Sequence, residues 1–88
     1  MAWRIDFTPD AEKALAKLDR QTQKLIRDYL REKIAPLDNP RVCGEGLKAN
    51  LSGLWRYRVE NYRIICSIAD EKLVVLVIKI GHRRDVYN

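Results

Sequence analysis

Hydrophobic and polar residues alternate at the start of the chain and then change to a helical spacing. Trp3, Ile5 and Phe7 are separated by polar residues, which predicts a strand with one buried face. Beyond this strand, apolar residues recur every three or four positions, which predicts a helix. Thr8 suits the N-cap of this helix and Pro9 suits its first turn. The chain therefore begins with a strand that is followed directly by an amphipathic helix.

A second helical pattern covers residues 20–35, with Asp19 as its N-cap and Pro36 as its stop. Its apolar residues fall on one face: Leu25, Ile26, Tyr29 and Leu30. Residues 36–46 then contain two prolines and two glycines, which predicts a connecting segment. Whether this segment is mobile is left open by the sequence.

Three strand patterns occupy the second half of the chain, at residues 54–59, 62–68 and 72–80. Short turns at residues 60–61 and 69–71 separate them, which predicts consecutive antiparallel strands. The predicted class is α+β, with the order β-α-α-β-β-β and both N-terminal helices on one face of an antiparallel sheet. We expect residues 1–88 to form a single domain.

Arginines are concentrated on one face of the predicted hairpin. Alternation turns the aromatic and aliphatic residues of the strand toward the helices, and Arg56 and Arg58 to the opposite face. If Glu60 and Asn61 form a two-residue turn, Arg63 lies across from Arg58 on that same face. Three converging positive charges are destabilising, which favours a functional role. The alternative is a solvated strand surface that discourages aggregation.

The positive charge is uneven along the chain. The net charge is +5, and residues 41–88 hold nine Lys and Arg against five Asp and Glu. Such an excess favours a polyanionic partner, although an ordinary basic surface shows the same excess. No apolar run is long enough for a membrane span and no signal-peptide pattern is present, so we expect a cytoplasmic protein without a membrane partner. The two cysteines are expected to be reduced, with a disulfide as the weaker alternative.

The segments "LWRYRVENYRIICSI" and "VVLVIKIGHRRDVY", preceded by one strand and two amphipathic helices, resemble the RelE toxins of the RelE/ParE superfamily. The resemblance covers essentially the whole chain and implies the RelE/ParE-like, microbial RNase-like fold. It also implies a toxin of a type II toxin–antitoxin system that enters the ribosomal 30S A site and cuts mRNA there without a metal or other cofactor. A cognate RelB-like antitoxin would be the inhibitory partner.

The resemblance also implies which residues act. The basic positions of the first two meander strands correspond to Arg56, Arg58 and Arg63. The basic position after the glycine of the last strand corresponds to Arg83, and the terminal tyrosine to Tyr87. RNA-binding positions correspond, more loosely, to Lys48 and Arg84. Several family members have lysine where this chain has Arg56 and Arg58. Arginine preserves phosphate binding but does not replace a lysine in proton transfer.

The expected reaction is attack by the RNA 2′-hydroxyl, which gives a 2′,3′-cyclic phosphate. Arginine suits the stabilisation of the phosphorane, but it is not a base near neutral pH. His82 is therefore the expected general acid or base, with an ordinary loop histidine as the alternative. Glu60 is a weaker candidate base, and Tyr87 could stack on a base, orient the nucleophile or serve only in packing. With so few acids and bases, we expect the ribosome to orient the mRNA for cleavage.

Two other functions remain open from the sequence. One is a ParE-like inhibitor of DNA gyrase, which the arginine constellation disfavours because such toxins lack it. The other is a non-catalytic, basic RNA-binding domain, which the absence of an exposed aromatic pair on the sheet disfavours. An antitoxin is expected to use an acidic or amphipathic segment against the helices or the arginines.

Overall fold

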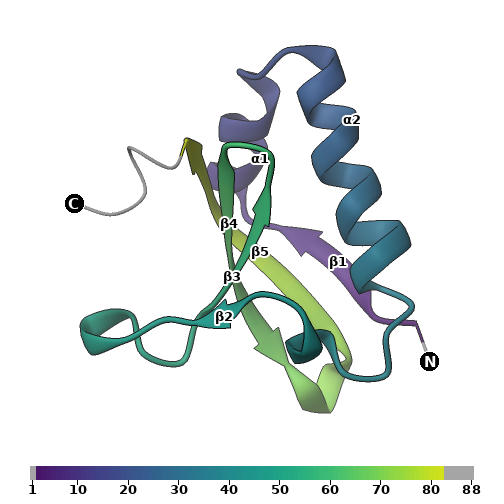
Figure 1. The fold of residues 1–88 in the computed structure, drawn as a ribbon, viewed down its shortest axis with the longest axis vertical. Helices are drawn as coiled ribbons and strands as arrows, with labels where there is room; N and C mark the ends of the chain where they lie inside the picture. Colours follow the sequence, from purple (N-terminus) through teal and green to yellow (C-terminus); the bar gives the residue numbers. More distant parts are fainter. Residues whose placement is uncertain (1, 83–88) are drawn as a thin grey trace.

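Two helices cover one face of a five-stranded sheet in the computed structural model, which describes residues 2–82 (Figure 1). The elements in chain order are β1 (Arg4–Phe7), α1 (Pro9–Ala16), α2 (Arg20–Asp28), β2 (Glu45–Gly46), β3 (Trp55–Val59), β4 (Tyr62–Ala69) and β5 (Val74–His82). The strands lie side by side in the order β1-β5-β4-β3-β2. The predicted α+β class is confirmed, and the short strand β2 is an element that the sequence did not predict.

Both helices begin at the predicted caps. The Thr8 hydroxyl accepts the Ala11 N–H at 3.1 Å, and the Asp19 carboxylate accepts the Thr22 N–H at 3.1 Å. After α2 the chain continues as a π-helical turn over Tyr29–Ile34. The predicted second helix is therefore confirmed, but its last part is wound more widely than an α-helix.

The sheet is mixed. We expected an antiparallel sheet, and β2 to β5 are antiparallel, but β1 pairs with β5 in parallel. A parallel pair needs a crossover connection, and the two helices provide part of it. At the β3–β4 hairpin the predicted turn is confirmed, because Arg58 lies directly opposite Arg63 and Val59 opposite Tyr62.

A β-bulge interrupts the pairing of β4 with β5. Ile65 lies opposite Lys79, while the next residue, Cys66, lies opposite Val77, so Ile78 is an extra residue in β5. Cross-strand partners project to the same side of a sheet. The bulge therefore allows Val77 to face the helices and Lys79 to face the opposite side.

The core lies between the helices and the sheet. Its fully buried side chains come from both layers: Leu15, Ile26, Leu30, Ile34, Tyr57, Ile64, Val75 and Val77. Each aliphatic side chain among them contributes about 1.5–3 kcal/mol by leaving water. No helix within residues 2–82 is both long and apolar enough to cross a membrane.

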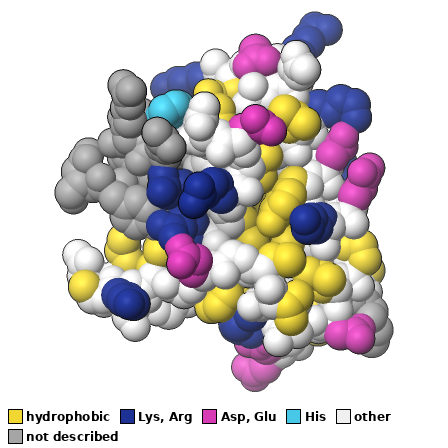
Figure 2. All heavy atoms as spheres, viewed as in Figure 1, with side chains coloured by type: hydrophobic (Ala, Val, Ile, Leu, Met, Phe, Trp, Pro, Cys, Tyr) yellow, Lys and Arg dark blue, Asp and Glu magenta, His cyan; other side chains and the backbone are white. Residues whose placement is uncertain are grey.

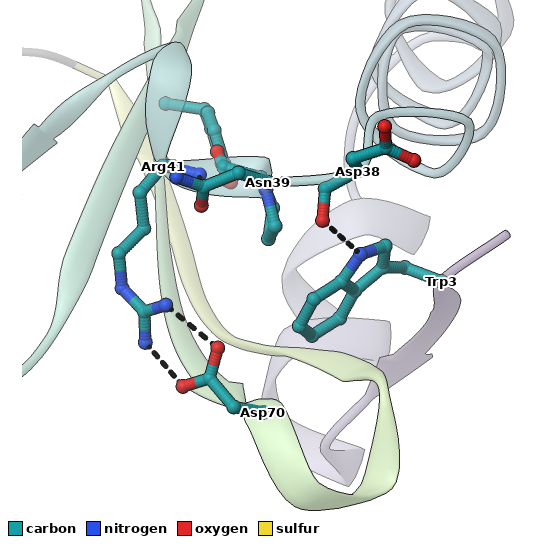
Figure 3. A network of polar contacts seen from close by, with 7 residues as sticks. Trp3, Asp38, Asn39, Arg41 and Asp70 are labelled. Carbon is teal, nitrogen blue, oxygen red and sulfur yellow. Dashed lines mark hydrogen bonds and ion pairs between the residues drawn. The ribbon is translucent and has the colours of Figure 1, made fainter. Parts of the chain in front are cut away.

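The connection between α2 and β2 is fastened to the body of the protein. The Arg41 guanidinium makes two hydrogen bonds to the Asp70 carboxylate, at 2.8 and 2.9 Å, and so ties the connection to the β4–β5 turn (Figure 3). The Trp3 indole N–H donates to the Asp38 carbonyl at 3.4 Å. The segment whose mobility the sequence left open is thus fastened at two points, next to β1 and at the β4–β5 turn.

Candidate active site

Three arginines lie on the face of the sheet that the helices leave uncovered. Arg56 and Arg58 alternate with the buried Tyr57 along β3, and Arg63 faces Arg58 from β4. Arg58 is exposed, and the other two arginines are half-buried. Figure 2 shows one group of adjoining Lys and Arg side chains on the side of the molecule away from α2, and other Lys and Arg side chains spread over the same view. The structure therefore brings together the three arginines that the sequence predicted to converge.

A carboxylate from β2 enters this cluster. Glu45 is the cross-strand partner of Arg56, and its carboxylate forms an ion pair with the Arg56 guanidinium. The Glu45 side chain is 63% exposed and that of Arg56 is 20% exposed, so the pair lies at the rim of the cluster. The expectation of like charges alone is thus corrected: one arginine is compensated by an acidic neighbour.

The backbone before Glu45 is fixed by two aromatic side chains of β3. The Trp55 indole N–H donates to the Cys43 carbonyl at 2.7 Å, and the Tyr57 hydroxyl donates to the Pro40 carbonyl at 2.6 Å. Gly44, which follows Cys43, has φ +79°. A Cβ atom at this position would lie 2.3 Å from the Arg56 carbonyl oxygen. Only glycine fits this position, and its close approach brings the chain against β3.

A hollow of about 330 Å³ lies beside the ion pair. It is lined by Tyr29, Gly44, Glu45, Arg56 and Arg58. A larger groove of about 560 Å³ runs between α2 and the end of β3, and it shares Tyr29 and Arg58 with the hollow. The arginine cluster therefore borders concave space rather than a flat sheet. The sequence placed Tyr29 on the apolar face of its helix and gave no signal that it borders this site.

Lys79 is a further cation on this face. It lies opposite Ile65, which lies opposite Arg56, so the three residues form one row across β5, β4 and β3. Lys79 is exposed. The sequence did not predict this residue for the site, because its orientation depends on the bulge in β5.

His82 is the last residue of β5, at the end of the sheet. It is the cross-strand partner of Tyr62, and the two rings meet edge to face with centroids 5.7 Å apart. Tyr62 pairs with Val59, which faces the helices, so His82 shares that side at the end of the sheet. Its place in the strand thus directs the His82 side chain to the helix side, and not to the arginine face, where it was expected to transfer protons.

The remaining predicted site residues are not joined to the cluster by the described contacts. Lys48 is exposed in the loop between β2 and β3, beyond the paired residues of β2. Glu60 is exposed at the hairpin turn and lines the larger groove. Arg83, Arg84 and Tyr87 lie outside the described residues. Within residues 2–82, no three His, Cys, Asp or Glu side chains are placed to hold a metal ion.

The comparisons with known proteins agree with this architecture. The family model for the ParE toxin of type II toxin–antitoxin systems matches residues 5–87. The mRNA interferase toxin RelE of Escherichia coli is 30% identical over 93 residues, which cover 100% of this chain and 93% of the relative. The toxin RelG of Mycobacterium tuberculosis is 26% identical over 87 residues, or 99% of this chain and 98% of the relative.

Solved structures show the same fold. The toxin–antitoxin complex RelBE2 from Mycobacterium tuberculosis matches with a TM-score of 0.85 and 25% identity, over 97% of this chain and 95% of the matched chain. The isolated RelE toxin of Escherichia coli matches with a TM-score of 0.73 and 26% identity, over 92% of this chain and 84% of that toxin. The Mycobacterium tuberculosis structure is that of a toxin–antitoxin complex. The match to the family model and the full-length similarity to RelE show that the chain belongs to the RelE/ParE family of toxins of type II toxin–antitoxin systems.

Proposed function

We propose that this toxin is an mRNA endoribonuclease that acts in the A site of the ribosome, in the cytoplasm. Cleavage would proceed by attack of the 2′-hydroxyl on the adjacent phosphate, without a metal, and would leave a 2′,3′-cyclic phosphate. The observation that supports this proposal most directly is the convergence of Arg56, Arg58 and Arg63 on one open face beside the Glu45 carboxylate. A purely structural sheet does not need this arrangement.

The arginines suit the charge that develops during the reaction. Each guanidinium presents a planar fork of N–H donors that can contact two phosphate oxygens. As the 2′-oxygen attacks, negative charge accumulates on the non-bridging oxygens, and fixed donors are worth most at that moment. Arg58 and Arg63, which face each other from β3 and β4, can hold the scissile phosphate from two sides.

Glu45 is the described residue best placed to remove a proton from the 2′-hydroxyl. A carboxylate that contacts a hydroxyl group can accept its proton as a general base. Glu45 lines the same hollow as Arg56 and Arg58, and its side chain is 63% exposed to an incoming RNA strand. The role that we assigned to His82 from the sequence passes to Glu45 in this proposal. Arg83 and Tyr87 stay site residues by the family resemblance, and water supplies the proton that the leaving 5′-oxygen takes up.

The need for a ribosome follows from the scarcity of acids and bases beside the arginines within residues 2–82. In-line attack requires the 2′-oxygen, the phosphorus and the 5′-oxygen to be nearly collinear, which a flexible single strand seldom achieves. A ribosome that holds the A-site codon could supply this orientation, and proximity and orientation of this kind are worth several kcal/mol. An antitoxin with an acidic or amphipathic segment would stop the reaction by covering the arginine face.

Primer extension on a defined mRNA tests the proposal. Purified toxin is incubated with the mRNA alone and with programmed ribosomes, alongside Arg58→Ala, Glu45→Gln and the control Lys72→Ala, an exposed residue of the distant β4–β5 turn. We expect cuts within A-site codons that require ribosomes, remain in the control and weaken at least about tenfold in the two site variants.

The outcomes separate the proposed function from its alternatives. Efficient cleavage of mRNA without ribosomes would contradict the ribosome requirement. An absence of cleavage under both conditions would contradict the nuclease assignment. A supercoiling assay with DNA gyrase would then test the alternative that the sequence left open.

A further inference from the structure

Tyr29 stands at the edge of the arginine cluster, although it belongs to the helical layer. It is the first residue of the π-helical turn that follows α2, and it lines both the hollow beside Glu45 and the larger groove. Its side chain is half-buried, whereas Leu30, the next residue, is completely buried. The helix therefore extends one aromatic ring beyond the core toward the proposed site of cleavage.

Neighbouring residues hold the ring in place. Tyr29 meets Tyr57 edge to face, with ring centroids 6.1 Å apart and planes at 60°. The Lys33 ammonium lies over the Tyr29 ring, 5.7 Å from its centroid. Tyr57 is itself fixed by its hydrogen bond to the Pro40 carbonyl. Burial raises the pKa of Tyr29, so its hydroxyl keeps its proton at neutral pH and adds no negative charge to a site for RNA.

The hollow combines the groups that recognise an unstacked nucleobase. Proteins bind single-stranded RNA by stacking its bases on aromatic rings or guanidinium planes and by hydrogen bonding to their edges. Here the lining residues are an aromatic one, Tyr29, two arginines, Arg56 and Arg58, and an acidic one, Glu45. A volume of about 330 Å³ lies at the lower end of the range for small-ligand pockets. The space is suited to one base rather than to a helix of a partner protein.

We infer that this hollow is a base subsite, in which Tyr29 stacks on the nucleobase of a nucleotide next to the scissile phosphate. This inference rests on the proposed function, because it uses the same arginines to hold the phosphate. The base would leave the RNA stack and enter the hollow, while Arg58 and Arg63 contact the backbone on the open face of the sheet. Codon preference would then arise partly from how well each base fits against Tyr29.

Fluorescent RNA tests this inference directly. Short oligonucleotides with 2′-fluoro riboses cannot be cleaved, and each carries 2-aminopurine at one position. Fluorescence anisotropy measures binding, and quenching of 2-aminopurine reports stacking. With the wild-type toxin at saturation, we expect strong quenching at one position of the strand. Tyr29→Leu should abolish that quenching and weaken binding at least about fivefold, because it removes the stacking partner.

Two variants serve as controls. Tyr29→Phe keeps the ring and should keep both the quenching and the affinity. Leu25→Ala removes an exposed side chain one helical turn earlier, which lines the larger groove but not the hollow. It should leave both readouts unchanged. If Tyr29→Leu does not fold, as judged by circular dichroism, the wild type and Tyr29→Phe decide the question. Quenching at the same single position in both proteins supports the base subsite, and equal quenching at every position overturns it.

The result also distinguishes the inference from the proposed function. If the toxin binds the oligonucleotides but quenches 2-aminopurine at none of the positions, the base subsite is overturned and the nuclease proposal is not affected. Loss of quenching in Leu25→Ala but not in Tyr29→Leu would place the base in the larger groove and would also overturn it. A toxin that binds none of the oligonucleotides would overturn the base subsite, and the ribosome-dependent primer extension would decide the nuclease proposal separately.

Discussion

The hydrogen bond between Tyr57 and Pro40 links the stability of the protein to the shape of its candidate site. The Tyr57 side chain is completely buried, and its hydroxyl donates to the buried Pro40 carbonyl at 2.6 Å. Replacing Tyr57 by Phe keeps the packing of the ring but leaves that carbonyl without its partner. An unsatisfied buried acceptor costs about 1–3 kcal/mol, a large part of the roughly 5–15 kcal/mol that stabilises a typical domain.

The expected loss can be measured by urea unfolding and by calorimetry. For a domain of this size, each kcal/mol lowers the melting temperature by about 4–8 °C, so Tyr57→Phe should melt about 5–20 °C lower than the wild type. The variant should also lose ribosome-dependent cleavage at temperatures where it remains folded. The reason is that the same bond holds the segment before Glu45 against β3.

Tyr62→Phe is the matched control. Tyr62 is half-buried, and its hydroxyl has no hydrogen bond to another residue within the described part of the chain. It should change the free energy of unfolding by less than about 0.5 kcal/mol. Equal losses in the two variants, or a loss below that value in Tyr57→Phe, would refute the assignment of the hydrogen bond as a structural link.

Three further predictions concern the backbone and the charges around the site. Gly44→Ala should weaken both folding and cleavage, because a Cβ atom at this position meets the β3 backbone. Gly53 has φ +96° and open space around it, so Gly53→Ala should bring only local strain. Thermal melts and cleavage assays compare the two variants. The Arg41 guanidinium lowers the pKa of Asp70, so this carboxylate stabilises the fold above its unfolded pKa near 4 and loses that effect as the pH falls through its folded pKa. The stability difference between wild type and Asp70→Asn in urea titrations should therefore shrink below about pH 4; a constant difference would argue against the pair. Thr8→Ala removes the N-cap of α1 and should cost about 1 kcal/mol in urea unfolding, whereas Thr8→Ser, which keeps the hydroxyl, should cost much less.

Local sequence signals predicted the elements well because each depends on neighbouring residues. The cap at Thr8, the helical spacing and the two-residue turn after Val59 all act over a few positions. Alternation then placed Arg56 and Arg58 on the open face, because nothing interrupts β3.

The missing parts of the site depend on contacts between distant segments. Glu45 lies in a segment rich in proline and glycine, and only its pairing with Arg56 reveals its place. The helical periodicity predicts Tyr29 as a core residue. Its position beside the hollow depends on the packing of the helical layer against β3. The orientation of His82 could not be predicted from alternation along β5, because the bulge changes which residues share a face partway through the strand.

The bulge in β5 has a consequence for how the length of this strand can vary. Ile78 is one residue more than the pairing with β4 requires. If Ile78 were deleted, Val77 and Lys79 would be adjacent in a regular ladder and would project to opposite faces. Val77 would still face the helices, and Lys79 would still face the open side. A deletion between Lys79 and His82 would instead turn the following residue over. Related chains that differ by one residue in this strand could therefore share a core and an open face, provided that the difference lies at the bulge.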